Sequence, residues 1–325
     1  MGGGAYDYEA HKELTTSRAT LPVEEVFRRR NLDPKMNPFG VQFRESRDSA
    51  AHPDSIGIIF ALDETGSMGN IPPDLAQREL PSFMQLVLDG NFVRDPQVLF
   101  GGIGDALMGE EAPCQVGQFE SEAGLMDQWL TALYLERKGG GNVGESYDLF
   151  LYWAARHTSM DCFEKRGRKG YLFITGDEPI FSTVSAAAVK RYIGDDIAND
   201  IPIKEVIAEV SKTFHVFYLI PDRQRAGSCE RSWKNVLGDR VITMESYQDT
   251  CAVAATLIGI TEGTVTLDDL PAKLTSLGKG EQANSVFRAV EAYAASIGKG
   301  GESRPVEGDD AAPPIRRGKK GPGRV

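Results

Sequence analysis

Short, continuous apolar runs are the clearest pattern in this sequence. The first run, IGIIFAL at residues 56–62, is rich in β-branched and aromatic residues and ends abruptly in the polar stretch DETGSMGN. Such a run is typical of a parallel strand that is covered on both faces. QVGQFE at 115–120 is shorter and more polar, which favours an edge strand. Four further runs resemble the first: VLFGGI at 98–103, YLFIT at 171–175, FHVFYLI at 214–220 and RVITM at 240–244.

Stretches with a helical spacing of apolar residues lie between these runs. Strands that alternate with helices predict a doubly wound α/β fold, in which right-handed crossovers place helices on both faces of a mostly parallel, six-stranded sheet. We find no internal repeat. The helical stretches within the alternating pattern are 75–88, 122–135, 145–157, 184–193, 203–212 and 248–258, and two more follow it at 267–277 and 282–297.

The segments on either side of the alternating pattern differ from it in composition. Residues 1–52 have mixed polarity with several prolines, which predicts an N-terminal arm and not an independent core. We assign residues 53–262 to the α/β domain and residues 263–297 to a helical extension that packs on its rim. Residues 298–325 consist of Gly, Pro and charged residues with almost no apolar side chain, so we expect a disordered tail.

Length and composition narrow the class of protein. A chain of 325 residues with 41% hydrophobic residues can form one large core with extensions. It contains no run of 18 apolar residues, and its start lacks a basic segment followed by an apolar one, so we expect neither a membrane span nor a signal peptide and predict a cytoplasmic protein. The four cysteines are too far apart for a Cys-x-x-Cys zinc site and too few for a disulfide scaffold.

Charge is unevenly distributed along the chain. The formal net charge is −11, yet residues 316–325 contain five basic residues and no acid, so the rest of the chain carries −16. An acidic body repels nucleic acid, which makes nucleic acid an unfavoured partner. Two interpretations of the basic tail stay open: a contact for a phosphate polymer or an acidic protein surface, and a solvated terminus that aids solubility.

The first apolar run is followed by a candidate metal-binding loop. In open α/β sheets, ligands bind beyond the carboxyl ends of the strands, where the strand order reverses. Here Asp63, Thr65 and Ser67 place a carboxylate and two hydroxyls at alternate positions of a turn that Gly66 permits. This hard, all-oxygen set of low charge suits Mg²⁺ or Mn²⁺. We expect Glu64, between them, to face solvent or a partner.

Three other loops supply further polar groups. Asp177 directly follows YLFIT and is the natural second carboxylate, and Glu178 beside it should face solvent or a partner. The glycine-rich stretch 139–146 leads into a predicted helix, where Asn142 or Ser146 could supply another oxygen. Asp105, after VLFGGI, offers one more acid.

These loops together resemble the von Willebrand factor A (VWA) domain. In that family a metal-ion-dependent adhesion site is built from Asp-x-Ser-x-Ser after the first strand, a Thr or Asp from a second loop, and an Asp after the fourth strand. Asp63, Thr65 and Ser67 match the first element, and Asp177 matches the third. The resemblance covers residues 55–260 in the expected order.

The glycine-rich loop resembles a variant, Gly-Gly-Gly-Asp-x-Pro-Glu, found in A domains of the alpha-kinase-associated type. Asn142 stands where that variant has its acid and Gly144 where it has proline, whereas Glu145 is retained. Asp105 stands where the same subgroup often has an Asp after its second strand. The resemblance implies metal ligands and residues that support them: Asp63, Thr65, Ser67, Asp177 and Asn142 around the ion, with Asp105, Glu145 and Ser146 behind them.

The resemblance also implies a function in binding and not in catalysis. In this family the open coordination position of the metal is typically filled by a Glu or Asp of a partner protein. Bacterial intracellular members often accompany AAA+ ATPases or protein kinases and phosphatases. The implied role is an adaptor in such a multi-component system.

Other interpretations of the same residues stay open. Asp63 or Thr65 could cap a following helix, Asp177 could be an ordinary turn residue, and Asn142 and Ser146 could have purely local roles. A Mg²⁺-dependent phosphohydrolase also places an Asp after its first strand, but it usually needs a second Asp two positions later, where this chain has Thr65.

Overall fold

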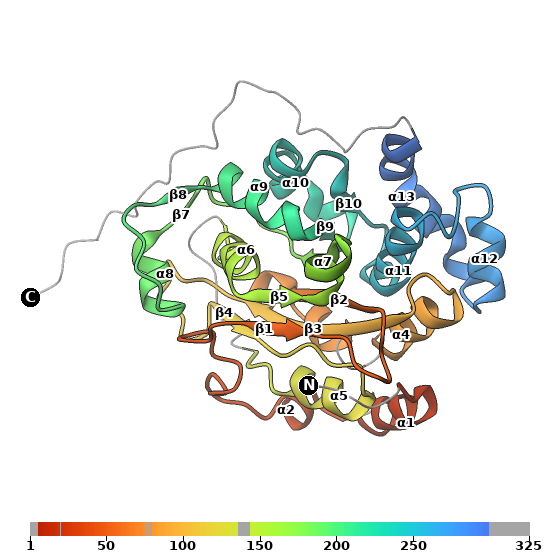
Figure 1. Cartoon of the computed structure of the whole chain (residues 1–325), viewed down its shortest axis with the longest axis horizontal. Coiled ribbons are helices and arrows are strands. Elements are labelled where there is room, and N and C mark those ends of the chain that lie inside the picture. The colour runs from red at the N-terminus through yellow and green to blue at the C-terminus, as the bar shows by residue number, and fades with distance from the viewer. Residues whose placement is uncertain (1–5, 20, 76, 78–79, 136–143, 299–325) are drawn as a thin grey trace, which may run out of the picture.

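A six-stranded sheet forms the centre of the molecule (Figure 1). The computed structural model describes residues 6–19, 21–75, 77, 80–135 and 144–298. The strand order is β10-β9-β6-β2-β3-β4, and only the β3–β4 pair is antiparallel. The predicted fold class, a doubly wound and mostly parallel α/β sheet, is therefore confirmed. The strands are β2 (Ser55–Asp63), β3 (Asp95–Ile103), β4 (Cys114–Val116), β6 (Gly170–Thr175), β9 (Phe214–Ile220) and β10 (Val241–Thr243).

Burial on both faces explains the continuous apolar runs. Every residue of β2 is buried, because helices cover both sides of the sheet. On one face Phe60 pairs in register with Phe100 on β3 and Phe173 on β6, and their rings stack at centroid distances of 6.4 and 5.2 Å. Phe217 on β9 continues this row at 5.4 Å from Phe173. An aromatic row therefore ties four adjacent strands together across the core.

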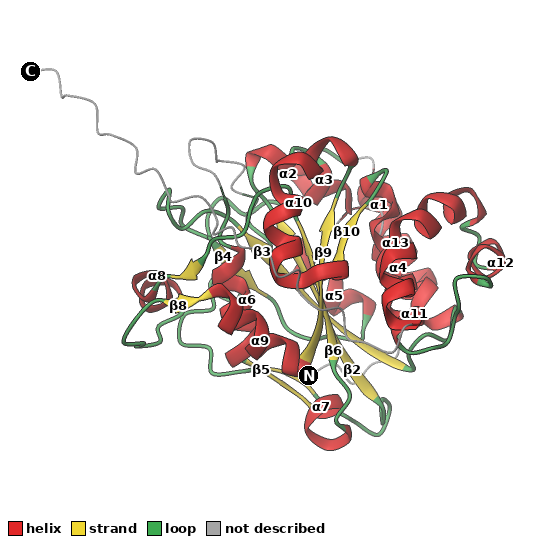
Figure 2. Ribbon diagram, turned by 90° about the horizontal axis from the view of Figure 1, so that it is seen from above, coloured by secondary structure: helices red, strands yellow, loops and turns green. Residues whose placement is uncertain are grey.

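Helices lie on both sides of this sheet (Figure 2). Helices α6, α9 and α10 lie on one side, while α4, α11 and α13 lie on the other. Helices α1 and α5 pack against each other, and α1 also contacts α4. The helices are α1 (Tyr8–Ala19), α2 (Val23–Val26), α3 (Ile71–Asp74), α4 (Leu80–Asp89), α5 (Ala123–Thr131), α6 (Tyr147–Arg156), α7 (Asp161–Arg166), α8 (Ala186–Tyr192), α9 (Ile203–Thr213), α10 (Arg223–Leu237), α11 (Thr250–Thr261), α12 (Leu270–Ser276) and α13 (Ala283–Gly298).

Two small sheets and five helices, α1, α2, α3, α7 and α10, were not predicted from the sequence. Helix α7 is only six residues long, and polar residues outnumber apolar ones in α10, although its buried residues Cys229, Trp233 and Val236 do lie at helical spacing. Two short strands, β1 (Arg44–Ser46) and β5 (Thr158–Met160), pair in parallel. The other two, β7 (Thr183–Val184) and β8 (Ile201–Pro202), pair in antiparallel orientation. Elements this short lack a detectable period of their own.

The segments before and after the α/β pattern contact the domain closely. Met36 is fully buried, and its carbonyl accepts a hydrogen bond from the backbone N–H of Val116 in β4 at 2.8 Å. Tyr293 of α13 packs edge-on against Phe217 at 4.9 Å, so the C-terminal helix closes the end of the aromatic row. Among the residues that the structure describes, no helix is both long enough and apolar enough to cross a bilayer.

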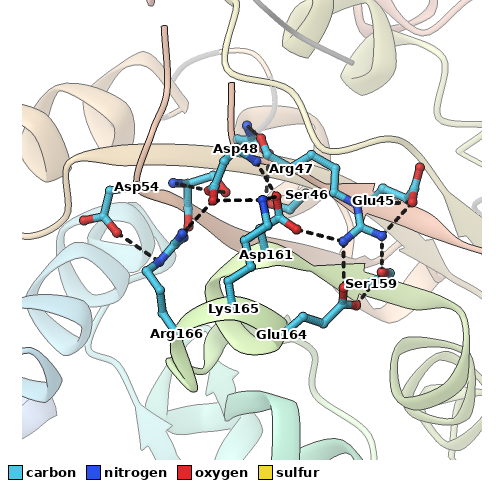
Figure 3. A network of polar contacts seen from close by, with 12 residues as sticks. Glu45, Ser46, Arg47, Asp48, Asp54, Ser159, Asp161, Glu164, Lys165 and Arg166 are labelled. Carbon is cyan, nitrogen blue, oxygen red and sulfur yellow. Dashed lines mark hydrogen bonds and ion pairs between the residues drawn. The ribbon is translucent and has the colours of Figure 1, made fainter. Parts of the chain in front are cut away.

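A network of ion pairs fastens the β1 segment to α7 (Figure 3). The carboxylate of Asp161 accepts hydrogen bonds from Arg47 Nη1 at 2.9 Å, from the backbone N–H of Asp48 at 2.8 Å and from Lys165 Nζ at 2.6 Å. Its side chain is only 5% exposed. These partners hold the pKa of Asp161 below its ordinary value although burial acts in the opposite direction. The carboxylate therefore stabilises the fold in its ionised form.

Replacing Asp161 with Asn should lower the free energy of unfolding by about 1–3 kcal/mol, because a nearly buried carboxylate loses its charge while three donors still point at it. Urea unfolding at neutral pH measures this change. Asp196→Asn is the matched control, since Asp196 is 84% exposed in its pair with Lys190 and should contribute less than about 0.5 kcal/mol. Equal effects of the two substitutions would contradict this account of the network.

Candidate metal centre

The candidate residues lie at the point where the strand order of the sheet reverses. From β2 the chain proceeds outward through β3 to β4, then returns to the other side of β2 and proceeds through β6 and β9 to β10. Strands β2 and β6 are therefore adjacent and parallel, with Leu62 opposite Thr175. Asp63 ends β2, and Asp177 lies just beyond the end of β6. Both carboxylates consequently lie at the same edge of the sheet, where ligands bind in such folds.

A continuous chain of side-chain oxygens joins the two loops. The Thr65 hydroxyl donates to Asp63 Oδ1 at 2.6 Å, and the Ser67 hydroxyl donates to Asp177 Oδ1 at 2.7 Å. The two hydroxyl oxygens, Thr65 Oγ1 and Ser67 Oγ, are 3.1 Å apart. Four of the five predicted ligands are thus brought together, and the fifth, Asn142, lies outside the described residues.

The number of hydroxyl protons limits how the four side chains of this oxygen chain can be hydrogen-bonded. Three oxygen–oxygen contacts link the four residues, but each hydroxyl carries only one proton. When both carboxylates are ionised and receive these protons, no proton remains between the two hydroxyl oxygens, and their lone pairs face each other. A cation bound between the two loops would use these lone pairs; without one, the Thr65 hydroxyl can turn to Ser67, because Asp63 also accepts from the Thr65 N–H and the Tyr147 hydroxyl. Two carboxylates and two hydroxyls are a donor set that fits a hard divalent ion.

Burial of Asp63 favours the same conclusion. Its side chain is fully buried, and burial raises its pKa to about 7, against hydrogen bonds from Thr65 and Tyr147 that lower it. The negative charge of Asp177 adds to the rise. An ionised Asp63 is therefore costly without further positive charge nearby.

The bond from Thr65 to Asp63 is local and is not a helix cap. The backbone N–H of Thr65 also donates to Asp63 Oδ1, at 3.0 Å, which closes a tight turn before the short 3₁₀ helix at Gly66–Met68 begins. The Thr65 side chain makes no capping hydrogen bond to that helix. The alternative interpretation, in which this loop only caps a helix, is therefore not what the structure shows.

Three packed aromatic side chains lie next to Asp63 and hold it in place. The hydroxyl of Tyr147, the first residue of α6, donates to Asp63 Oδ2. The Tyr147 ring packs edge-on against Tyr218 and Trp233, which stack on each other at 3.8 Å. A Cβ atom at position 176 would lie 2.3 Å from the Tyr147 hydroxyl, so only glycine fits beside Asp177. These contacts fix the orientation of Asp63.

One basic side chain binds to both loops of the site. Arg225, in the first turn of α10, forms an ion pair with Asp177 Oδ2 and donates to the backbone carbonyl of Ser67 at 2.6 Å. Arg225 was not among the predicted site residues, and neither was Tyr147. For Arg225 a signal existed, because Asp222 and Arg225 follow the strand at 214–220 at the same edge of the sheet. For Tyr147 only its place after Ser146 in a predicted helix could have pointed to it.

Several buried acids surround the oxygen chain. Asp105 is fully buried after β3, and its Oδ1 accepts from the backbone N–H groups of Leu107 at 2.8 Å and Met108 at 3.2 Å. Ser146 ties this loop to α6, since its hydroxyl accepts from the backbone N–H of Ala106 at 2.9 Å. Burial, followed by the charges of Asp63 and Asp105, raises the pKa of Glu145 to about 9. The predicted supporting residues Asp105, Glu145 and Ser146 thus shape the surroundings of the oxygen chain, with no hydrogen bond to it.

The expectation for Glu64 was wrong. Glu64 is 4% exposed, and its Oε2 accepts a hydrogen bond from Gln115 Nε2 at 2.6 Å. It points across β3 and does not face solvent, because a Cβ atom at Gly102 would lie 2.4 Å from its Oε1. Glu178 is partly exposed, as expected for a residue at the rim.

Within the described ranges, no group of three or more His, Cys, Asp or Glu side chains is placed to hold a metal ion. The oxygen chain does not conflict with this finding, since only two of its four members are carboxylates. A metal at this site would depend on hydroxyl oxygens as much as on charge.

Comparisons with known proteins give structural similarity alone. No protein-family model and no curated protein matches the sequence. The structure is similar to the pilus adhesin SpaC from Lactobacillus rhamnosus GG (12% identity, TM-score 0.44, 68% of this chain and 32% of that one). It is also similar to the proximal thread matrix protein 1 of the mussel byssus, solved with a zinc-occupied MIDAS motif (10%, 0.37, 63% and 48%). A third similar structure is a von Willebrand factor type A protein from Catenulispora acidiphila (11%, 0.37, 70% and 49%). The chain spans less than half of each of these proteins.

Asp148 provides a pH test of the buried acids. It is 5% exposed next to the site, and burial, followed by the charge of Asp105, raises its pKa to about 7. For an acid whose pKa is higher in the folded state, the unfolded chain ionises first, so its stabilisation is complete below about pH 4 and is lost as the pH rises toward 7. Asp148→Asn should therefore match the wild type at pH 4 and be more stable than it at pH 8.

Urea unfolding of both proteins in chelator at the two pH values measures this difference. The two proteins are identical at every other residue, so the contributions of the rest of the chain largely cancel in the comparison. An equal loss of stability between pH 4 and pH 8 in wild type and variant would show that Asp148 is not a source of the pH dependence.

Proposed function

We propose that this chain is a VWA-type protein that holds one divalent cation and uses it to bind a partner protein. The observation that carries the proposal is the oxygen chain from Asp63 through Thr65 and Ser67 to Asp177, which gathers two carboxylates and two hydroxyls from two loops at one edge of the sheet. Because its donors are carboxylates and neutral hydroxyls, Mg²⁺ or Mn²⁺ is the preferred ion.

The bound ion would supply an open coordination position that attracts a carboxylate of the partner protein. The chain's own residues do the rest. Thr65 and Ser67 contribute oxygens without charge, so the protein does not fully neutralise the ion. The hydroxyl of Tyr147 donates a hydrogen bond to Asp63 and so holds its carboxylate in one orientation. A partner that presents a Glu or Asp side chain fits this arrangement.

Two exposed apolar side chains in the loop after β3 support the proposal that the partner is a protein. Leu107 and Met108 are 54% and 52% exposed, although both are large hydrophobic residues. Their loop is held firmly, because Asp105 accepts both of their backbone N–H groups and Ser146 holds Ala106. Exposed apolar side chains on a fixed loop are a favourable docking element for another protein.

We also propose that the chain is not an enzyme. A phosphohydrolase of this sheet type uses a second acid two positions after its nucleophile, and Thr65 occupies that position. The sequence resemblance supports a cytoplasmic adaptor that works with an AAA+ ATPase or with a protein kinase or phosphatase.

Replacing Asp63 with Ala should weaken Mn²⁺ binding by more than about 100-fold, because the variant loses a carboxylate that the oxygen chain depends on. The fold should persist, since the substitution also relieves a costly buried charge. Titration calorimetry with MnCl₂ or MgCl₂ measures the affinity, and circular dichroism measures the fold.

Asp196→Ala is the control, because it removes one exposed carboxylate away from the site. It should bind the ion as tightly as the wild type. Unchanged Mn²⁺ affinity in the Asp63 variant would contradict the proposed centre. Turnover of p-nitrophenyl phosphate with Mg²⁺, abolished by Asp63→Asn, would instead favour the phosphohydrolase.

A further inference from the structure

Arg225 connects three loops at the carboxyl edge of the sheet. Its Nη1 donates to the carboxylate of Asp177, in the loop after β6, and to the carbonyl of Ser67, in the loop after β2. Its Nε donates to Asp222 Oδ2 at 2.9 Å, in the loop after β9. Asp222 in turn caps α10, because its Oδ1 accepts from the backbone N–H groups of Gln224 at 2.9 Å and Arg225 at 3.1 Å.

The guanidinium and the oxygen chain share one carboxylate. Asp177 uses Oδ1 for the Ser67 hydroxyl and Oδ2 for Arg225. Its side chain is only 6% exposed, so little water screens this pair. Arg225 itself is 29% exposed. A positive charge therefore already lies on one of the two proposed ligand carboxylates.

Two cations that share one carboxylate oppose each other. The guanidinium takes up part of the negative charge of Asp177, and it repels a divalent ion held by the same group. Its bond to the Ser67 carbonyl acts differently, since it helps to hold the loop in place. The two effects predict opposite results when Arg225 is removed, so they can be separated.

We propose that Arg225 is the resident cation of the metal-free site and that it lowers the affinity of the site for divalent ions. This inference rests on the proposed function. It goes further by assigning to one residue the balance between the metal-free and metal-bound states. The bound ion has to weaken the pairing of Arg225 with Asp177, and the charge of Arg225 opposes the ion more than its hydrogen bonds assist it.

The test compares Mn²⁺ affinities by titration calorimetry. Arg225→Ala should bind Mn²⁺ about tenfold more tightly than the wild type, or tighter still, because a like charge next to the ion is removed. Arg223→Ala is the matched control: it removes the same charge from the same turn of α10, but Arg223 pairs with Glu245 at 3.4 Å and is 69% exposed. Its affinity should stay within about twofold of the wild type.

A second variant guards against loss of the fold. Arg225→Gln removes the positive charge but keeps N–H donors for Asp177 or the Ser67 carbonyl, and it should also bind Mn²⁺ more tightly. Unchanged or weaker binding in both Arg225 variants would overturn the inference and leave Arg225 as a structural clamp.

Asp63→Ala separates the two proposals. If the wild type binds Mn²⁺ and Asp63→Ala does not, while the Arg225 variants fail to tighten, only the inference about Arg225 is wrong. If neither the wild type nor the Arg225 variants bind Mn²⁺, both proposals are wrong.

Discussion

The parallel pairing of β2 with β6 is the constraint on which the candidate site depends. Residues Ile58–Leu62 lie opposite Tyr171–Thr175 in register. Because the strands are parallel and adjacent, their carboxyl ends coincide, and the residues that follow them must share one edge of the sheet. A slip of this register, or another strand between the two, would separate Asp63 from Asp177. The oxygen chain would then not form.

The core is built so that this register is strongly preferred. Phe60 and Phe173 stack across the β2–β6 pair, and the row continues to Phe100 and Phe217 on the outer neighbours. A shift of one residue would turn these rings to the opposite face of the sheet and leave their space unfilled. The same apolar packing that stabilises the fold therefore fixes the position of two polar loops. Stability and the geometry of the site have a common origin.

The sequence predicted the sheet well because its strands are buried on both faces, and such strands are continuous apolar runs. It placed Asp63, Thr65, Ser67 and Asp177 at one edge for the same reason, since strand ends can be located when strands can. Helix α10 was missed because polar residues outnumber its apolar ones, although Cys229, Trp233 and Val236 lie at helical spacing on its buried face. Arg225 lies on that helix, so its ion pair with Asp177 followed from tertiary structure and not from a motif.

Glu64 shows a second limit of sequence reasoning. Its neighbours in the chain suggested an exposed loop, yet Gly102 on β3 leaves room for its side chain, and Gln115 on β4 donates to it. Such compensation between distant positions is invisible in a local pattern. A carboxylate after a strand can therefore point inward, if another strand supplies both space and a donor.

The charges around the site explain why it is suited to a ligand. Asp63, Glu145 and Asp148 are buried acids with raised pKa values of about 7, 9 and 7. Burial is the largest cause in each case, and a neighbouring carboxylate adds to it. Hydrogen bonds from Thr65 and Tyr147 compensate Asp63 only in part. A fold stabilised only by its core would gain from apolar residues at these positions. Under the proposed function, a bound cation would offset the cost of ionising these acids, which are gathered at the edge of the sheet where ligands bind in such folds.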